Sequence, residues 1–195
     1  MELKKATVQN FRSASNPYAA GWTAALICYP PFLLMGSGGP IDYHQNTGDW
    51  AFWTDGHLVL QALIGTVLVI LTCFYAWGTV AFGLRFSNLT HRGIVTNGPF
   101  RFTRHPAYFS KNLFWWLFSM PFLATSDSLV DVVRNCALLA ATNAVYYWRA
   151  RTEERHLLAD PTYRAYYEWS EQHALVPRLF NRLRGKRPPP DACQI

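Results

Sequence analysis

The sequence predicts an all-α protein, a polytopic bundle of about four transmembrane helices followed by a cytosolic helical segment. Of its 195 residues, 50% are hydrophobic and only 15% are charged, whereas about 25% of an average soluble domain is charged. The apolar residues are concentrated in four separate runs. Basic and acidic residues alternate between the polar segments that separate these runs. Together these features indicate a chain whose helices are solvated by lipid.

The four apolar runs cover residues 19–35, 57–84, 108–124 and 129–148. A bilayer core about 30 Å thick needs roughly 20 helical residues to cross it, and the second run has this length without any Lys, Arg, Asp or Glu. Pro30 and Pro31 should kink or end the first helix, because proline removes a backbone donor and clashes with the preceding turn. The third and fourth runs carry Lys111, Asp131 and Arg134 near their starts, where long side chains can reach the interface.

The distribution of charge predicts which side of the membrane each loop faces. Residues 1–18 contain three Lys or Arg, residues 85–106 contain four, and the chain from residue 149 onward contains nine. Residues 36–56 contain three aspartates and no basic residue. By the positive-inside rule, both termini and the 85–106 loop should face the cytosol. The membrane would be the inner membrane of a bacterium or the endoplasmic reticulum of a eukaryote.

The net charge of +6 does not indicate a nucleic-acid partner. Basic residues beside membrane spans set topology and contact anionic headgroups, which accounts for the basic run at residues 182–187. The histidines show no metal-ligand spacing, so no metal is expected. We expect residues 1–180 to form one membrane-embedded domain, with its sequence motifs in residues 83–180, and residues 181–195 to be a basic, proline-rich flexible tail.

Three polar groups of residues fall on the predicted cytosolic side: residues 98–108, the pair Glu153-Glu154, and residues 163–178. They supply cations, an imidazole, carboxylates and aromatic rings beside apolar helices. Such a combination suits an amphiphilic substrate with a charged head and a lipid tail.

The order and spacing of these groups resemble a known family. The matching residues are Gly98-Pro99-Phe100-Arg101, Arg104-His105-Pro106-Ala107-Tyr108, Glu153-Glu154, Pro161-x-Tyr163-x-x-Tyr166 and Pro177-Arg178. Over residues 83–180 the chain is similar to the isoprenylcysteine carboxyl methyltransferase and phospholipid methyltransferase family. The resemblance implies an integral membrane methyltransferase that binds S-adenosylmethionine without a Rossmann domain.

The resemblance also implies roles for single residues. The cofactor pocket would be built by Gly98, Arg101, Arg104, His105, Pro106, Tyr108, Glu153 and Glu154. Among these, Arg104, His105 and Glu154 are the catalytic candidates. The substrate candidates are Tyr163, Tyr166 and Arg178, together with Lys111 and Asn112, because polar groups at membrane depth usually face a cavity or a partner. Phe100 and the segment 110–112 depart from the family pattern. These departures affect the expected identity of the substrate more than that of the cofactor.

The chemistry of the residues agrees with this assignment. Arg104, His105 and the backbone N–H groups at the start of a helix suit the carboxylate of the cofactor, and a glutamate can accept from its amine or ribose. The methyl acceptor stays open between a prenylcysteine carboxylate, a phospholipid amine and a small thiol. Only an acceptor that must lose a proton, such as an amine, needs a general base, for which His105 or a glutamate is the candidate.

Other interpretations of the same residues stay open. The arginines can act only as topology signals, the two glutamates as surface ion pairs, and the tyrosines as an interfacial aromatic belt. The alternative functions are a nicotinamide-dependent membrane reductase of the sterol type, which has a similar helical core, and a membrane scaffold that has lost the chemistry.

Overall fold

The computed structural model describes residues 18–28, 36, 38–82, 94–183 and 185. All regular secondary structure in these residues is helical, which confirms the predicted fold class for the described part of the chain. The elements in chain order are α1 (Ala19–Leu26), α2 (Trp50–Trp53), α3 (Leu58–Phe82), the 3-10 helix η2 (Gly98–Arg101), α4 (Pro106–Ser119), α5 (Leu129–Leu157), α6 (Pro161–His173) and α7 (Leu175–Leu183).

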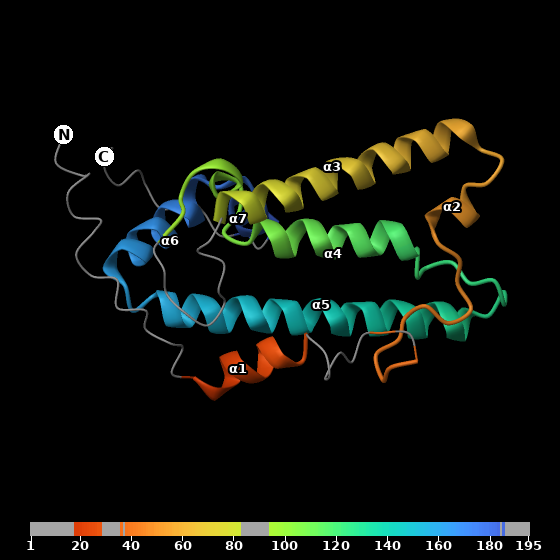
Figure 1. Ribbon diagram of the computed structural model, residues 1–195, viewed down its shortest axis with the longest axis horizontal. Coiled ribbons are helices and arrows are strands. Elements are labelled where there is room, and N and C mark those ends of the chain that lie inside the picture. The colour runs from red at the N-terminus through yellow and green to blue at the C-terminus, as the bar shows by residue number, and fades with distance from the viewer. Residues whose placement is uncertain (1–17, 29–35, 37, 83–93, 184, 186–195) are drawn as a thin grey trace.

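The long helices α3, α4 and α5 lie side by side and form an elongated body (Figure 1). Helix α4 lies between α3 and α5, and α1 lies along the other side of α5. Helices α6 and α7 and η2 gather at one end of this body, and α2 lies at the other end. The residues proposed to carry chemistry therefore collect at one end of the helical body.

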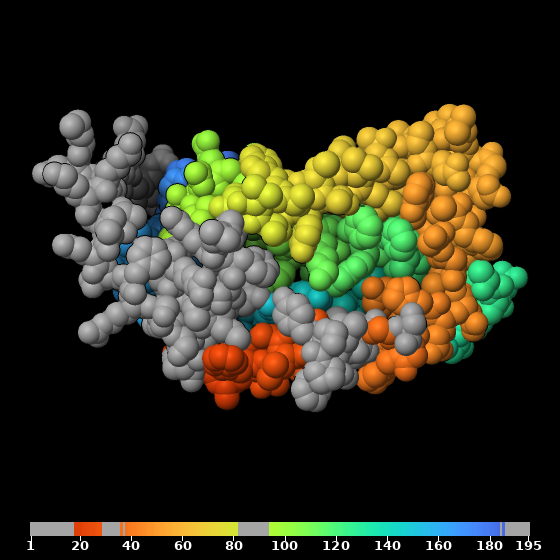
Figure 2. All heavy atoms as spheres, viewed as in Figure 1, coloured from red at the N-terminus to blue at the C-terminus, as the bar shows by residue number. Residues whose placement is uncertain are grey.

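Helix α3 has the length and composition to cross a membrane. Its segment Leu58–Ala81 spans 24 residues, and only 6% of its most apolar window is buried. Leu58, Val59 and Val80 are each at least three-quarters exposed, and α3 forms the outer edge of the molecule (Figure 2). Soluble proteins rarely expose such a continuous apolar surface, so lipid is its natural surrounding. By length and composition, this helix agrees with the second predicted span.

The other three predicted spans differ from the helices observed. Helix α4 begins at Pro106 and ends at Ser119, because Met120 adopts a left-handed conformation with φ 39° and Pro121 follows. It therefore ends before the predicted limit at residue 124. Helix α5 has 29 residues and joins the fourth predicted span to the polar segment after it. Helix α1 has eight residues, and residues 29–35 of the first predicted span lie outside the described residues. A bundle of four spans stays a prediction.

The start of α4 is fixed against α3 by close packing. A Cβ atom added at Gly78 of α3 would lie 3.3 Å from Cγ of Pro106, so only a very small residue fits at this crossing. Pro106 is buried and occupies the first turn of α4, where its missing N–H removes no helical hydrogen bond. The loop before α4 is thereby anchored to the apolar helix.

The chain turns between α5 and α6 as the sequence predicts. Helix α5 ends at Leu157, and the Asp160 carboxylate accepts a hydrogen bond from the Thr162 backbone N–H at 2.7 Å. Pro161 follows as the first residue of α6. This cap and proline start a new helix, which returns over the end of the body. Helix α7 continues to Leu183, three residues past the expected start of the flexible tail, and residues 186–195 of that tail lie outside the described residues.

Candidate functional site

Helix α6 holds the loop that carries the first motif. Gly98 has φ +60°, a conformation that favours glycine, and a Cβ atom there would lie 3.4 Å from Nε1 of Trp77. The chain then forms η2, in which Phe100 is buried against Tyr163 and Tyr166. The Tyr166 hydroxyl donates a hydrogen bond to the Phe100 carbonyl at 2.7 Å. Gly98 and the two tyrosines thus shape this loop.

Arg104 joins the loop to α5 and α6. Its Nε donates to Oε1 of Glu154 at 2.8 Å, and its Nη1 donates to Glu171 at 2.6 Å and to Ser170 at 3.1 Å. Its guanidinium carbon lies 4.2 Å from the ring centroid of Tyr167. Burial opposes the charge of Arg104, but the two carboxylates outweigh burial and raise its pKa. Arg104 is a permanently charged group whose Nε and Nη1 both donate to protein partners.

Glu154 is a buried carboxylate that accepts from two arginines and lies beside the ring of His105. His105 Nε2 lies 3.0 Å from the Oε1 atom that also accepts from Arg104, and Arg151 Nη1 donates to Oε2 at 2.9 Å. Burial alone would raise the pKa of Glu154. The hydrogen bond and charge of His105 and the charge and hydrogen bond of Arg104 lower it instead, to about 2. Glu154 is therefore ionised at any physiological pH.

The contact with Glu154 determines what His105 can do. A carboxylate beside Nε2 favours the tautomer that carries its proton there, which leaves Nδ1 as an acceptor. None of the hydrogen bonds among the described residues uses His105 Nδ1, and the side chain is 21% exposed. The imidazole is thus oriented on one side and available to a ligand on the other.

Glu153 is in the opposite environment from its neighbour Glu154. Burial raises its pKa, although the charges of His105 and Arg149 oppose this effect. The Tyr108 hydroxyl donates a hydrogen bond to Oε2 of Glu153 at a long 3.4 Å. The Tyr108 ring stacks on His105 with centroids 5.6 Å apart. Two adjacent carboxylates therefore differ in environment: Glu154 is held by several short contacts, and Glu153 has one long one among the described residues.

Lys111 and Asn112 extend the polar site along α4. Lys111 lies six residues beyond His105, about 9 Å deeper along the helix axis. Its ammonium donates to the Tyr146 hydroxyl at 3.2 Å and lies 4.7 Å from the centroid of the Trp115 ring. Within the described residues no carboxylate lies at ion-pair distance from it, and the buried Oδ1 of Asn112 has no hydrogen-bond partner there. A polar seam thus runs from His105 toward the middle of the bundle.

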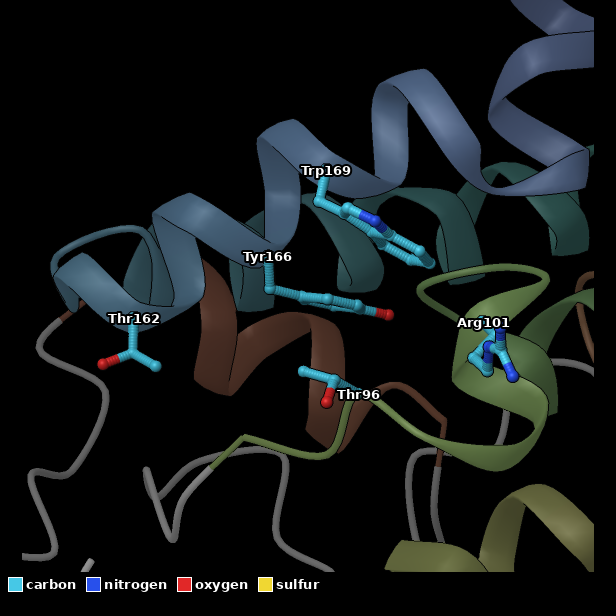
Figure 3. A pocket seen from close by; sticks show the side chains of 5 residues that line it. All are labelled: Thr96, Arg101, Thr162, Tyr166 and Trp169. Atoms are coloured by element: carbon cyan, nitrogen blue, oxygen red, sulfur yellow. The ribbon is translucent and has the colours of Figure 1, made fainter. Parts of the chain in front are cut away.

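Arg101 and Tyr166 meet at a separate hollow between η2 and α6. The hollow has a volume of about 350 Å³ and is lined by Thr96, Arg101, Thr162, Tyr166 and Trp169, whose side chains are drawn in Figure 3. Three of these residues come from α6, one comes from η2 and one from the segment before it. The cavity combines a cation, two threonine hydroxyls and two aromatic rings, which are groups suited to a flat or anionic ligand.

The structure brings together part of the predicted site. Arg104, His105, Tyr108, Glu153 and Glu154 meet at the junction of α4, α5 and the loop. Arg178 is exposed on α7, and no side-chain contact joins it to these residues in the described part of the chain. Tyr163 is buried against Phe100, and burial raises the pKa of its hydroxyl, so it packs the loop.

Some residues of the site were not assigned from the sequence. Among them, Arg151 lies one turn before Glu154, a spacing that does point to the contact. Thr162 and Trp169 share a helix face with Tyr166 at spacings of four and three residues, so periodicity could have found them. Ser170 and Glu171 carry no such signal, because only the return of α6 over the loop brings them to Arg104.

Comparison with known proteins gives one match. The model of the isoprenylcysteine carboxyl methyltransferase (ICMT) family matches residues 57–159, more than half of the chain. This segment contains α3, η2, α4 and α5, and so includes both sides of the contact between His105 and Glu154. No curated protein and no solved structure matches the chain significantly.

Proposed function

Because the chain belongs to the isoprenylcysteine carboxyl methyltransferase family, we propose that it is a membrane-embedded, S-adenosylmethionine-dependent methyltransferase whose site is centred on His105. The observation that carries the proposal is the contact of His105 and Arg104 with Glu154. Glu154 follows His105 by 49 residues and Arg104 by 50 in the sequence, so the contact joins two separate motifs. Topology signals or surface ion pairs need no such convergence, and Glu154 is buried rather than at the surface.

We propose that the site faces the cytosol, with α1, α4 and α5 as further membrane segments beside α3. The charge distribution in the fold supports this orientation. Arg101, Arg104, Arg149 and Arg151 belong to the end of the body that holds α6 and η2, whereas Asp49 and Asp55 flank α2 at the other end. Basic residues favour the cytosolic side. The membrane would be a bacterial inner membrane or the endoplasmic reticulum.

The residues present fit the proposed cofactor. Its amine needs an acceptor, and Glu153 offers a carboxylate that has one long hydrogen bond within the described part of the chain. Its flat adenine ring needs aromatic surfaces, which Tyr166 and Trp169 supply in the 350 Å³ cavity beside Arg101. When bound, the cofactor supplies a methyl group already activated by the sulfonium, so correct positioning of the acceptor contributes much of the rate.

Arg104 and Glu154 act as positioning residues in this proposal. Arg104 bonds to Glu154 and to α6, and Glu154 in turn orients the imidazole of His105 as the carboxylate of a catalytic triad orients its histidine. His105 Nδ1 is the atom that meets a ligand. It can accept a proton from an acceptor that must lose one, and with an acceptor already ionised it serves as a hydrogen-bonding group.

Lys111 indicates the class of acceptor. An ammonium between two aromatic rings, without a carboxylate partner in the described part of the chain, favours an acceptor that carries negative charge. A lipid-like carboxylate or a thiolate fits this charge at the reacting group itself, whereas in a phospholipid amine the reacting group is not anionic and only the phosphate is. Asn112, whose Oδ1 is buried without a partner among the described residues, lies beside Lys111 and is the second acceptor-binding candidate.

The test is ligand binding by the purified chain in detergent. S-adenosylhomocysteine at 100 times its Kd should stabilise the fold by about 2.7 kcal/mol and raise the melting temperature, whereas NADP should have no effect. Stabilisation by NADP alone would instead support the reductase, and no response to either compound would support a scaffold.

The Lys111→Gln variant tests the acceptor site separately. It should keep the stabilisation by S-adenosylhomocysteine and raise the KM of an acceptor that bears a carboxylate or thiolate. An unchanged KM would contradict the assignment of Lys111 without affecting that of the cofactor site.

A further inference from the structure

Helix α7 presents an uncovered apolar face. Leu175, Leu179, Phe180 and Leu183 recur at the spacing of one helix side and are between 52% and 76% exposed. A helix with such a face is stable only when an apolar surface or a lipid boundary covers it.

Helix α7 is attached to the protein at two points. Its first turn is held by the Val176 backbone N–H, which donates to the Phe102 carbonyl at 3.1 Å. The Asn181 amide donates to Oε2 of Glu171 on α6 at 3.1 Å. At about 100° per residue, Asn181 lies on the far side of the helix from Leu179 and Leu183, so this contact directs the apolar side away from α6.

The apolar face of α7 continues the lipid-facing surface of α3. Phe102, which binds the start of α7 through its carbonyl, is 44% exposed and lies 6.5 Å from Trp77 of α3 between ring centroids. Trp77 is itself 49% exposed. Exposed apolar groups therefore run from the end of α3 through Phe102 to α7. A lipid surface that covers the end of α3 would therefore also reach α7.

The charge of α7 matches an anionic surface. Arg178 and Arg182 are its only charged residues, both are exposed, and Arg184, Lys186 and Arg187 follow in the sequence. Basic residues at a membrane surface each contribute about 1 kcal/mol when the lipid is anionic. A long apolar stripe flanked by arginines is typical of helices that lie in the headgroup layer.

We propose that α7 is an interfacial helix that lies in the headgroup layer of anionic lipid, with Leu179, Phe180 and Leu183 buried below the headgroups. The helix is linked to the site through Asn181, Glu171 and Arg104, so seating in the membrane holds α6 over His105. This places the site directly at the membrane surface, where a lipid-like acceptor would enter. The inference rests on the membrane location in the proposed function and not on methyl transfer.

The test is the depth of α7 in a bilayer. The full chain, with Cys28, Cys73, Cys136 and Cys193 replaced by serine, is spin-labelled at Leu183→Cys and reconstituted in nanodiscs of phosphatidylcholine with phosphatidylglycerol. The label should collide with oxygen and be protected from a water-soluble nickel complex. A label at the exposed Glu168→Cys on α6 serves as the water-facing control and should show the reverse. Arg178→Gln with Arg182→Gln should lower the ratio of immersed to water-exposed label by about fivefold per arginine.

Three outcomes would overturn the proposal. The first is a Leu183 label that collides with the nickel complex as often as the Glu168 control does. The second is a label shielded from both oxygen and the nickel complex, and the third is equal immersion in discs without phosphatidylglycerol. The second outcome would mean that protein covers the face. Crosslinking of the unmodified chain by a photoactivatable phosphatidylglycerol provides a check independent of the substitutions, since residues 175–183 should carry the adduct. None of these readouts depends on methyl transfer, so their failure is distinct from failure of the proposed function.

Discussion

Replacing either of the two adjacent glutamates by glutamine should change the stability of the fold differently: the loss of charge should be costly at Glu154 and not at Glu153. In the folded protein the pKa of Glu154 is about 2, against an ordinary value of 4.5. At about 1.4 kcal/mol per pH unit, this difference corresponds to roughly 3 kcal/mol of stability. Because the pKa is lowered, the contribution is complete above pH 4.5 and is lost as the pH falls toward 2. Glu154→Gln should therefore destabilise the protein by about 3 kcal/mol at pH 7.

Glu153→Gln is the matched control. Burial raises the pKa of Glu153 above its ordinary value of 4.5, so the ionised form is disfavoured in the folded protein. The contribution of this group to stability is therefore complete below pH 4.5 and is lost as the pH rises through the raised pKa. Replacing its carboxyl by an amide of the same shape should leave the stability at pH 7 unchanged or increase it. If Glu153 binds the cofactor, the same variant should also lose affinity for S-adenosylhomocysteine, which separates a binding role from a structural role.

The assay is thermal unfolding of the wild type and both variants in detergent, at pH 7 and at pH 3. For a chain of this length, a loss of 3 kcal/mol lowers the melting temperature by roughly 6–12 °C. The gap between wild type and Glu154→Gln should narrow at pH 3, because the native carboxylate is then losing its advantage. Equal melting of the three proteins at pH 7, or a gap independent of pH, would refute the assigned electrostatics.

The other predictions concern the loop before α4. Gly98→Ala should cost about 1 kcal/mol, because φ +60° is strained for a residue with a Cβ atom; an unchanged melting temperature would show that the loop relaxes. Tyr166→Phe should cost about 1–3 kcal/mol, because it leaves the Phe100 carbonyl without its donor. Tyr163→Phe is its control, since no hydrogen bond from the Tyr163 hydroxyl occurs among the described residues, and equal losses in the two variants would contradict the role of Tyr166.

Several features could be read from the chain before its fold. The apolar run at residues 57–84 is long enough to cross a membrane. Such a run is expected to be helical, because a backbone exposed to lipid must satisfy its hydrogen bonds within its own segment. The break at Asp160-Pro161 follows from local cap geometry. The family followed from the order and spacing of short motifs. All of these depend on local composition or on fixed spacing along the chain.

The limits of the remaining helices were less predictable. The apolar run at residues 108–124 predicted a span that reaches residue 124. Helix α4 ends at Ser119 instead, because Met120 adopts a left-handed backbone conformation. The apolar run at residues 129–148 does not mark the end of α5 either, because the helix leaves the run and continues to Leu157 before the break at Asp160-Pro161. Hydropathy reports the surrounding solvent, whereas helix ends depend on caps and on tertiary contacts.

The sequence by itself determined an α-helical chain with a membrane-length helix, its family and the residues that are candidates for chemistry. Only the tertiary structure decided which partners and which environment each of those residues has. It made Arg104 and Glu154 partners of each other and of His105, placed Glu153 in an environment that opposes its charge, and set Arg178 apart on α7. The physical reason is that a motif specifies residue types, whereas charge, burial and hydrogen bonding depend on neighbours that only the return of α6 over the end of the helical body supplies.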